Sequence, residues 1–270
     1  MVDSPSPSAN SLAASASPSQ RRSLVGRVGS ALRQVVDDFA NFVYPPSCAA
    51  CGAESLAQSG LCAECVAAFA PRRPTCRRCS APVGPHLETS SGCFHCREDR
   101  FAFARVFALG AYDGRLRDAV LRCKQPYERA VGLRMGELLA DRWLDELSAL
   151  QFDVLLPVPQ HWLGRLVSPQ PATGLIADGL GQRLSVPIDE QVLVKSRRTA
   201  PQASLPPTQR RNNLRDAFRV TRGTRLGGCR VLLVDDVLTT GTTAHRCSRV
   251  LLESGAASVH VAVLARGLGR

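Results

Sequence analysis

The sequence predicts an α/β protein with a mostly parallel sheet, preceded by a cysteine-rich segment. From residue 101 onward, short apolar runs typical of strands alternate with longer stretches in which apolar residues recur at helical spacing. Such alternation is typical of a parallel sheet whose strands are joined by helices. Before residue 101, eight of the eleven cysteines fall in one region as C-x-x-C pairs. We therefore expect two parts of different construction.

The first 44 residues precede both parts. Residues 1–22 are rich in Ser, Ala and Pro, and basic residues follow their weak apolar patch, whereas in a secretory signal they come first. We therefore expect a disordered tail over 1–22. Residues 23–44 place apolar side chains close to helical spacing and run into Pro45 and Pro46, which predicts an amphipathic helix.

Four C-x-x-C pairs lie within residues 45–98. Each pair can form one knuckle and two knuckles can close a tetrahedral thiolate site, so we predict a double zinc ribbon with two structural zinc ions. The sequential arrangement puts the first two pairs on one zinc and the last two on another; the crossed arrangement and iron–sulfur ligation are the alternatives. Paired cysteines of this kind indicate a reducing, cytoplasmic compartment. The predicted ligands are Cys48, Cys51, Cys62, Cys65, Cys76, Cys79, Cys93 and Cys96.

Residues 101–270 are expected to form the α/β domain. No apolar run approaches the length of a membrane span, because Arg, Gly and Pro interrupt each candidate. The expected order is a strand in 101–112, helices in 113–147 with a break near 125–126, a strand in 152–162, a helix over 174–184, strands in 187–200 and 226–241, a helix over 242–254 and a strand in 257–267.

The stretch from Val231 to Ala244 reads VLLVDDVLTTGTTA and carries the strongest functional signal. VLLV predicts a strand with two acids at its end, and T-T-G-T-T predicts the turn into a helix. In an open α/β sheet, ligands bind beyond the carboxyl ends of strands. Backbone N–H groups at a helix N-terminus bind anions, and glycine lets the backbone approach closely. We predict that a phosphate binds Thr239, Thr240, Gly241, Thr242 and Thr243.

The two adjacent acids, Asp235 and Asp236, indicate what else the ligand carries besides a phosphate. Carboxylates beside a phosphate would repel it, unless they accept hydrogen bonds from neutral hydroxyls of the same ligand. A ribose 5-phosphate meets both demands, because its 2- and 3-hydroxyls can donate to the two acids while its phosphate lies on the turn. The sequence therefore predicts a ribose-phosphate site.

This stretch closely resembles the signature of type I phosphoribosyltransferases and related binders of phosphoribosyl pyrophosphate. Together with the paired zinc ribbons, it makes the chain similar to the ComF family, bacterial proteins associated with competence for DNA uptake that include relatives of the gluconate-utilisation protein GntX. The resemblance runs from about Val43 to the C-terminus. It is carried by YPPSCAAC, by RCK at 122–124, by PVPQHW and by R-x-T-x-x-Q-x-x-L at 197–205, besides the phosphate motif.

The resemblance implies a type I phosphoribosyltransferase-like fold that binds phosphoribosyl pyrophosphate with Mg²⁺. The reaction of that class displaces pyrophosphate at the anomeric carbon of ribose. In one segment the sequence departs from the family: where R-G-F-N-Q usually follows the Pro-Val-Pro loop, equal-length alignment places SPQPA at 168–172. Lys124, Arg165 and Arg197 are then the candidate cations for the pyrophosphate.

A formal charge of +11 favours anionic partners. The first hypothesis is an accessory factor in DNA uptake or processing, with single-stranded DNA and DNA-processing proteins as partners; Phe94 or Phe69 would stack on bases, or else belong to a small core. The alternative is a catalytically active phosphoribosyltransferase, a glycosyltransferase with an unknown acceptor. No catalytic residue and no oligomeric state follow from the sequence. The arginines near the knuckles are Arg72, Arg73, Arg77, Arg78 and Arg97.

Overall fold

The computed structural model describes residues 47–54, 60–71, 73–125, 128–159, 171–195 and 217–268, which all belong to one compact unit, Ser47–Arg270. The predicted tail over 1–22 and helix over 23–44 lie outside the described residues, as do Arg72, Arg165 and Arg197. No helix of the described part has the length and apolarity that a membrane crossing requires.

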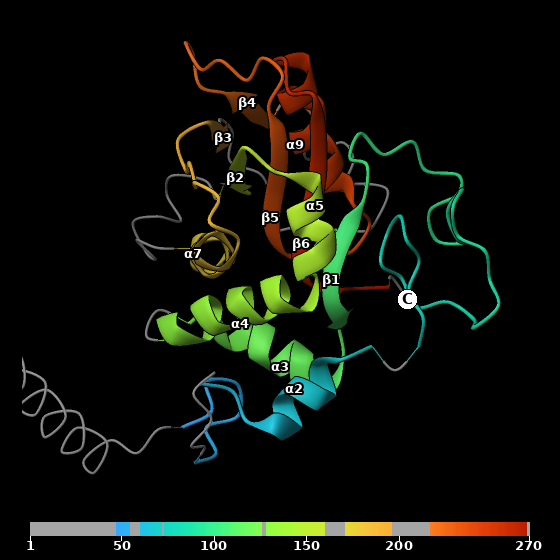
Figure 1. Cartoon of the computed structure of the whole chain (residues 1–270), viewed down its shortest axis with the longest axis vertical. Coiled ribbons are helices and arrows are strands. Elements are labelled where there is room, and N and C mark those ends of the chain that lie inside the picture. The colour runs from blue at the N-terminus through green and yellow to red at the C-terminus, as the bar shows by residue number, and fades with distance from the viewer. Residues whose placement is uncertain are drawn as a thin grey trace, which may run out of the picture. The chain divides into compact units, whose positions relative to one another are not determined.

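A four-stranded sheet forms the centre of the unit, and each of its neighbouring strands runs parallel to the next (Figure 1). This confirms the predicted α/β class. The strands, in their order across the sheet, are β1 (Val106–Ala111), β6 (Ser258–Arg266), β5 (Arg230–Leu238) and β2 (Val154–Pro157).

The sheet is buried on both faces. In β5, Leu232 and Val234 join one hydrophobic cluster, whereas Val231 and Leu233 join the cluster on the other face. In the neighbouring strand, Val261 pairs with Leu233 and belongs to the same cluster. Because successive side chains of a strand alternate between faces, a strand covered on both sides is apolar throughout, as VLLV is.

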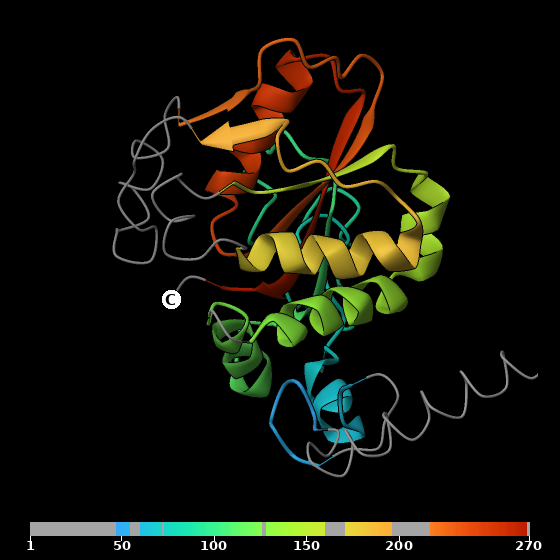
Figure 2. The ribbon, with the colours of Figure 1, turned by 90° about the vertical axis from the view of Figure 1, so that its left-hand side faces the viewer.

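Four helices cover one face of the sheet, and two of them approach each other very closely (Figure 2). A Cβ atom on Gly136 would lie 2.2 Å from the Ile176 carbonyl oxygen, so only glycine allows this approach. The close pair is α4 and α7, and the four helices are α3 (Gly114–Arg122), α4 (Arg129–Arg142), α5 (Leu144–Leu150) and α7 (Ala172–Leu184).

The other face is covered by α9 (Thr242–Glu253) and by a small antiparallel pair of strands. The pair consists of β3 (Leu193–Lys195) and β4 (Phe218–Val220). Only the first of these strands was predicted. A strand of three residues is too short to show the alternation on which a sequence-based prediction depends.

Two strand boundaries differ from the predictions. The strand expected to end at Val234 continues to Leu238, because β6 also continues and pairs Ala265 with Val237. The strand expected in 101–112 begins only at Val106; the preceding apolar residues instead form a stacked aromatic pair, Phe101 and Phe103, with ring centroids 4.6 Å apart.

The cysteine-rich segment contains one short helix, α2 (Ala63–Phe69), which was not predicted. Phe69 on this helix is 2% exposed and belongs to the cluster that α3 and α4 form against the sheet, with Leu61 beside it. The first knuckles therefore share the core of the α/β domain, which a segment so poor in large apolar residues needs in order to fold. The hypothesis that Phe69 stacks on a base is wrong, because its ring is buried.

Candidate functional site

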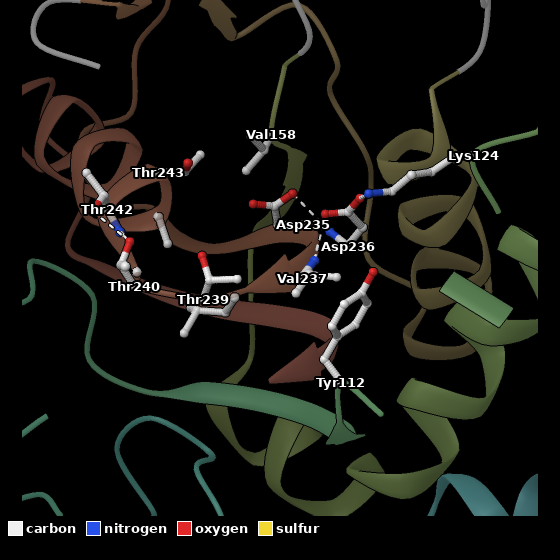
Figure 3. Close-up of a pocket in the computed structure, with 13 residues that line it drawn as sticks. Tyr112, Lys124, Val158, Asp235, Asp236, Val237, Thr239, Thr240, Thr242 and Thr243 are labelled. Atoms are coloured by element: carbon white, nitrogen blue, oxygen red, sulfur yellow. Dashed lines mark hydrogen bonds and ion pairs between the residues drawn. The ribbon is translucent and has the colours of Figure 1, made fainter. Parts of the chain in front are cut away.

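A cavity of about 310 Å³ opens at the carboxyl ends of the parallel strands (Figure 3). Tyr112 follows β1, Val158 follows β2, and Leu238 ends β5, so three strands of the sheet contribute to its wall. The location agrees with the edge at which open α/β sheets bind ligands. The remaining lining residues are Lys124, Asp235, Asp236, Val237, Thr239, Thr240, Gly241, Thr242, Thr243 and Ala244.

The two adjacent acids are held by the backbone that follows them. The N–H of Asp236 donates to Asp235 Oδ1 at 2.9 Å, and the N–H of Val237 donates to Asp236 Oδ1 at 2.6 Å. Each carboxylate thus has one oxygen fixed by the main chain. Both side chains line the same cavity, although neighbouring residues of a regular strand would point to opposite faces.

Lys124, at the end of α3, provides the positive charge nearest to this pair in the described part of the site. Its Nζ lies 2.7 Å from Asp236 Oδ2. Burial disfavours the charged amine, but the Asp236 carboxylate outweighs burial, so the pKa of Lys124 is above its usual value. Burial raises the pKa of Asp235 well above its usual value, and the charge of Asp236 raises it further. The two carboxyl groups are therefore not equivalent.

The threonine-rich turn forms the other half of the cavity, on the side away from Lys124 (Figure 3). Thr240 Oγ1 and Thr242 Oγ1 share a hydrogen bond of 2.9 Å. Gly241 has a φ of +73° and precedes the first residue of α9. Gly241 brings no capping side chain, and the N–H of Thr242 makes only a long contact of 3.4 Å with Thr240 Oγ1, so this helix N-terminus suits an anion.

Gly241 also lies against the aromatic ring of Phe101, which packs on the second group of cysteines as well. A Cβ atom at this position would lie 2.9 Å from Cε1 of Phe101. The left-handed φ and the close ring both favour glycine here. The turn is therefore shaped by a residue far away in the sequence as well as by its own residues.

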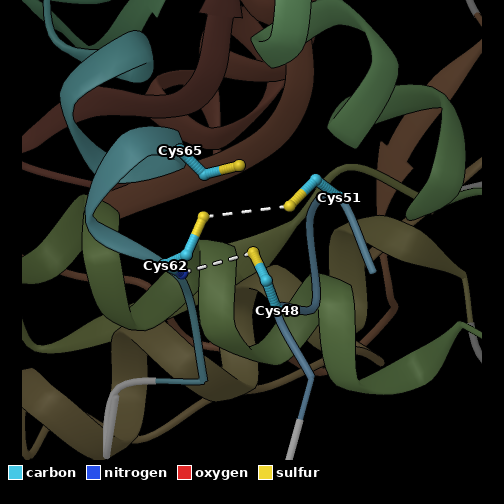
Figure 4. A group of neighbouring side chains, drawn as sticks. All are labelled: Cys48, Cys51, Cys62 and Cys65. Atoms are coloured by element: carbon cyan, nitrogen blue, oxygen red, sulfur yellow. Dashed lines mark hydrogen bonds between the residues drawn. The ribbon is translucent and has the colours of Figure 1, made fainter. Parts of the chain in front are cut away.

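The eight paired cysteines form two clusters, and within each cluster the sulfur atoms lie within 4.8 Å of one another. Figure 4 shows the first of them. The grouping is the sequential one: the first two pairs meet, and the last two pairs meet. Cys51 and Cys62 have sulfurs 3.8 Å apart, and Cys79 and Cys93 have sulfurs 3.7 Å apart. A tetrahedron with Zn–S bonds of about 2.3 Å has sulfurs about 3.8 Å apart, whereas a disulfide would need about 2.05 Å. The residues fit zinc.

The other residues considered from sequence fall into different environments. Phe94 is 79% exposed, whereas Arg78 is half-buried and donates to two main-chain carbonyls. Among the cysteines outside the C-x-x-C pairs, Cys123 and Cys247 are buried and Cys229 is half-buried. Burial raises the pKa of the Cys123 thiol to about 12. His95 is exposed and belongs to neither sulfur cluster.

Sequence reasoning did not single out two residues that lie at or near the cavity. Tyr112 lines it directly after β1. Lys195 ends β3, and burial lowers the pKa of this lysine while the Asp235 charge partly opposes the change. The only signal for Tyr112 was its place after a predicted strand. Nothing near Lys195 in the sequence indicated that it would approach Asp235.

Two domain families match the chain. Residues 39–97 match the double zinc ribbon domain, and residues 167–270 match the phosphoribosyl transferase domain. Among solved structures, a glutamine phosphoribosylpyrophosphate amidotransferase from B. subtilis is 24% identical, with a TM-score of 0.37, over 54% of this chain and 30% of its own. The chain thus spans less than a third of that protein.

Several curated proteins are similar over longer stretches. DNA utilization protein YhgH of Salmonella typhi is 28% identical over 187 residues, which cover 65% of this chain and 78% of that protein. YhgH of Escherichia coli strain K12 is 36% identical over 94 residues, 35% of this chain and 40% of its own. Competence protein F of Haemophilus influenzae is 25% identical over 178 residues, which cover 64% and 78% of the two chains.

The fold, the cavity and the two sulfur clusters together define a class of protein: a double zinc ribbon joined to a phosphoribosyltransferase-type α/β domain. Its homologues carry the names YhgH and competence protein F. These two domain matches and the named homologues confirm the predicted resemblance of the chain to the ComF family.

Proposed function

We propose that this protein binds phosphoribosyl pyrophosphate together with Mg²⁺ in the cavity at the end of β5. The observation that carries the proposal is that the two adjacent carboxylates and the threonine-rich turn face one cavity of about 310 Å³. The ribose 2- and 3-hydroxyls would donate to Asp235 and Asp236. The 5-phosphate would accept hydrogen bonds from the backbone and hydroxyls of Thr239–Thr243.

The positive charges needed for the pyrophosphate come from three parts of the chain. Lys124 already lies at the cavity, and we propose that it leaves Asp236 for the pyrophosphate when the ligand binds. Arg165 and Arg197 are the other candidates, and both lie outside the described residues. When bound, Mg²⁺ would offset the charge of the pyrophosphate and of the two carboxylates.

We further propose that this binding serves an accessory role in DNA uptake or processing in the cytoplasm. The names of the relatives, DNA utilization protein and competence protein, support this setting. The alternative is a catalyst that displaces pyrophosphate with an acceptor still to be found. Release of pyrophosphate in the presence of a nucleophile would support the alternative, whereas ligand binding without turnover over a broad acceptor screen would support the accessory role.

Calorimetric titration of phosphoribosyl pyrophosphate and Mg²⁺ into the zinc-loaded protein tests the proposed site. We expect binding by the wild type and none by the double variant Asp235→Asn, Asp236→Asn. The matched control is another adjacent acidic pair, Asp145→Asn with Glu146→Gln in the first turn of α5, which should bind normally. Absence of binding by the wild type would refute the proposal.

A second activity, binding of single-stranded DNA, is favoured by one surface feature of the second pair of knuckles. Phe94 is 79% exposed, and the guanidinium carbon of Arg97 lies 5.8 Å from its ring centroid. An exposed ring beside a cation suits stacking on a base next to a phosphate. We propose that these residues contact a single strand.

The comparison of two apolar truncations in the same segment tests this contact. Stacking contributes about 1–3 kcal/mol per base, so Phe94→Ala should weaken binding of an oligothymidine about 5- to 100-fold. Leu87→Ala removes an apolar side chain that is 53% exposed but carries no ring, and should leave the affinity unchanged. Binding should also weaken as salt rises. Equal effects of the two variants would contradict the proposed contact.

A further inference from the structure

A single buried arginine joins the second pair of knuckles to the phosphate-binding turn. Arg266, at the end of β6, is 5% exposed. Its Nε donates to the main-chain carbonyl of Cys79 at 3.0 Å, and its Nη1 donates to the carbonyl of Leu238 at 3.0 Å. The same Nη1 also contacts the carbonyls of Thr239 and Gly267. One planar guanidinium thus fixes the backbone of a cysteine ligand against the start of the turn.

The charge of Arg266 suits this location. Four thiolates around one divalent zinc leave a net negative charge, and the buried guanidinium lies beside that cluster. A buried charge that loses its partners is costly, so a rearrangement of the sulfur cluster that moves the Cys79 carbonyl would also displace Arg266. The carbonyls of Leu238 and Thr239 accept hydrogen bonds from the same guanidinium, so a shift of Arg266 would also move the turn.

A second connection reaches the same turn through Phe101. Arg78 donates to the carbonyls of Cys96 at 2.8 Å and Asp99 at 2.6 Å, and its guanidinium carbon lies 5.5 Å from the centroid of the Phe101 ring. That ring fills the space beside Gly241. The second pair of knuckles is therefore connected to the beginning of the turn through Arg266 and to its middle through Phe101.

The contacts of the first sulfur cluster run elsewhere. Arg115 on α3 donates to Glu64 at 3.2 Å and lies 3.8 Å from the sulfur of Cys65. The buried residues of these knuckles pack into the core of α3 and α4. The two clusters are similar in sequence, yet only the second is built onto the turn in the described part of the molecule.

We propose that the second zinc site is a structural part of the phosphate-binding turn, and that Arg266 is the positioning residue that couples them. Zinc held by Cys76, Cys79, Cys93 and Cys96 would keep the turn in its binding geometry. Loss of that zinc, by chelation or thiol oxidation, would weaken phosphate binding while the α/β core stays folded. The expected effect on ligand binding rests on the proposed function, whereas the coupling of the second zinc site to the turn does not.

Hydrogen exchange of the full chain tests the coupling without a ligand. Cys93→Ser disables the second site, and Cys51→Ser disables the first. We expect the peptide covering the turn to exchange about 10-fold faster or more in Cys93→Ser, and at the wild-type rate in Cys51→Ser. A peptide from the middle of α7 reports the core: faster exchange there measures general destabilisation, and in Cys93→Ser the turn peptide should be accelerated beyond it. Equal exchange of the turn peptide in all three proteins would overturn the proposal.

If the Cys93→Ser chain does not fold, the wild type answers the same question. Zinc is withdrawn by a chromophoric chelator, and brief alkylation identifies which four cysteines have become free. The turn peptide should gain exchange only after the second set of cysteines is alkylated. Faster exchange of the turn upon release of the first zinc alone would contradict the assignment.

A second experiment tests the coupling with the ligand present: if zinc at the second site favours ligand binding, the ligand must favour zinc binding equally. Phosphoribosyl pyrophosphate with Mg²⁺ should raise the affinity of the second site for zinc about 5- to 150-fold, and Arg266→Gln should abolish this effect while Arg115→Gln preserves it. Parallel calorimetry separates two failures. Binding of the ligand without any change in zinc affinity would refute the coupling and leave the proposed function intact. Absence of binding would refute the proposed function, while the exchange data would still decide the coupling.

Discussion

The ammonium group of Lys124 lies 2.7 Å from the Asp236 carboxylate, across a cavity edge that α3 and β5 build together. With the side chain of Lys124 still 47% exposed and that of Asp236 only 21% exposed, the lysine is the partner that can move. Its long, flexible stem allows it to turn from the carboxylate to an incoming anion.

Replacement of Lys124 should weaken binding of the pyrophosphate group without affecting binding of the ribose 5-phosphate part of the ligand. Lys124→Met keeps the length of the side chain and removes a charge-assisted hydrogen bond of about 1.5–3 kcal/mol, so we expect phosphoribosyl pyrophosphate to bind about 10- to 100-fold more weakly. Ribose 5-phosphate, which lacks the pyrophosphate, should bind as it does to the wild type. Calorimetry measures both. Arg117→Met on the exposed side of α3 is the control. A similar loss for both ligands would argue against this role.

The stability of the ligand-free protein should depend on pH through Asp235. Burial raises the pKa of this carboxyl group in the folded chain, whereas in the unfolded chain it titrates near about 4. Stability that comes from its proton is therefore complete below about pH 4 and is lost as the pH rises through the raised pKa. Asp235→Asn removes this loss.

We expect the Asp235→Asn variant to melt above the wild type by about 2 to 8 °C at pH 8, and the difference to shrink toward pH 4. Differential scanning calorimetry across this range measures it. Asp145→Asn, which changes an exposed acid on α5, should show no such trend. A difference that grows as the pH falls would have the wrong sign for this explanation.

Replacement of Gly241 by alanine should reduce ligand affinity more than the same replacement of a glycine with a similar φ elsewhere. Gly241 and Gly228 have φ values of +73° and +79°, but only a Cβ at Gly241 would meet a ring, whereas Gly228 has nothing within 4 Å. Alanine costs about 1–3 kcal/mol at either position because of its backbone. Gly241→Ala should in addition displace Phe101 and reduce ligand affinity at least about 10-fold. Comparable affinities of the two variants would show that the ring does not shape the turn.

The first sulfur cluster should matter for folding more than for the turn. Cys65 and Cys123 are both buried in the same hydrophobic cluster, but only Cys65 belongs to a sulfur cluster. We expect Cys65→Ala to lose one of two zinc equivalents and to lower the thermal midpoint by 10 °C or more, on the order of several kcal/mol. Cys123→Ala should cost about 1 kcal/mol and retain all zinc. Metal analysis and thermal unfolding check both. Full zinc content in Cys65→Ala would contradict the clustering.

The sequence determined those features of this protein whose parts lie next to one another in the chain. The threonine-rich turn joins a strand to the N-terminus of a helix without a break in the chain, so VLLVDDVLTTGTT was enough to predict this local structure. A C-x-x-C pair is likewise a local knuckle, and the alternation of apolar runs identified the parallel sheet.

Only the tertiary structure decided which distant groups complete these local units. The pairing of Lys124 with Asp236, the packing of Phe101 against Gly241 and the bond from Arg266 to Cys79 each join residues far apart in the sequence. Such contacts depend on the order of the strands in the sheet and on the surface of the α/β domain against which the knuckles pack. No local propensity encodes that choice, because it is made by the packing of the whole unit.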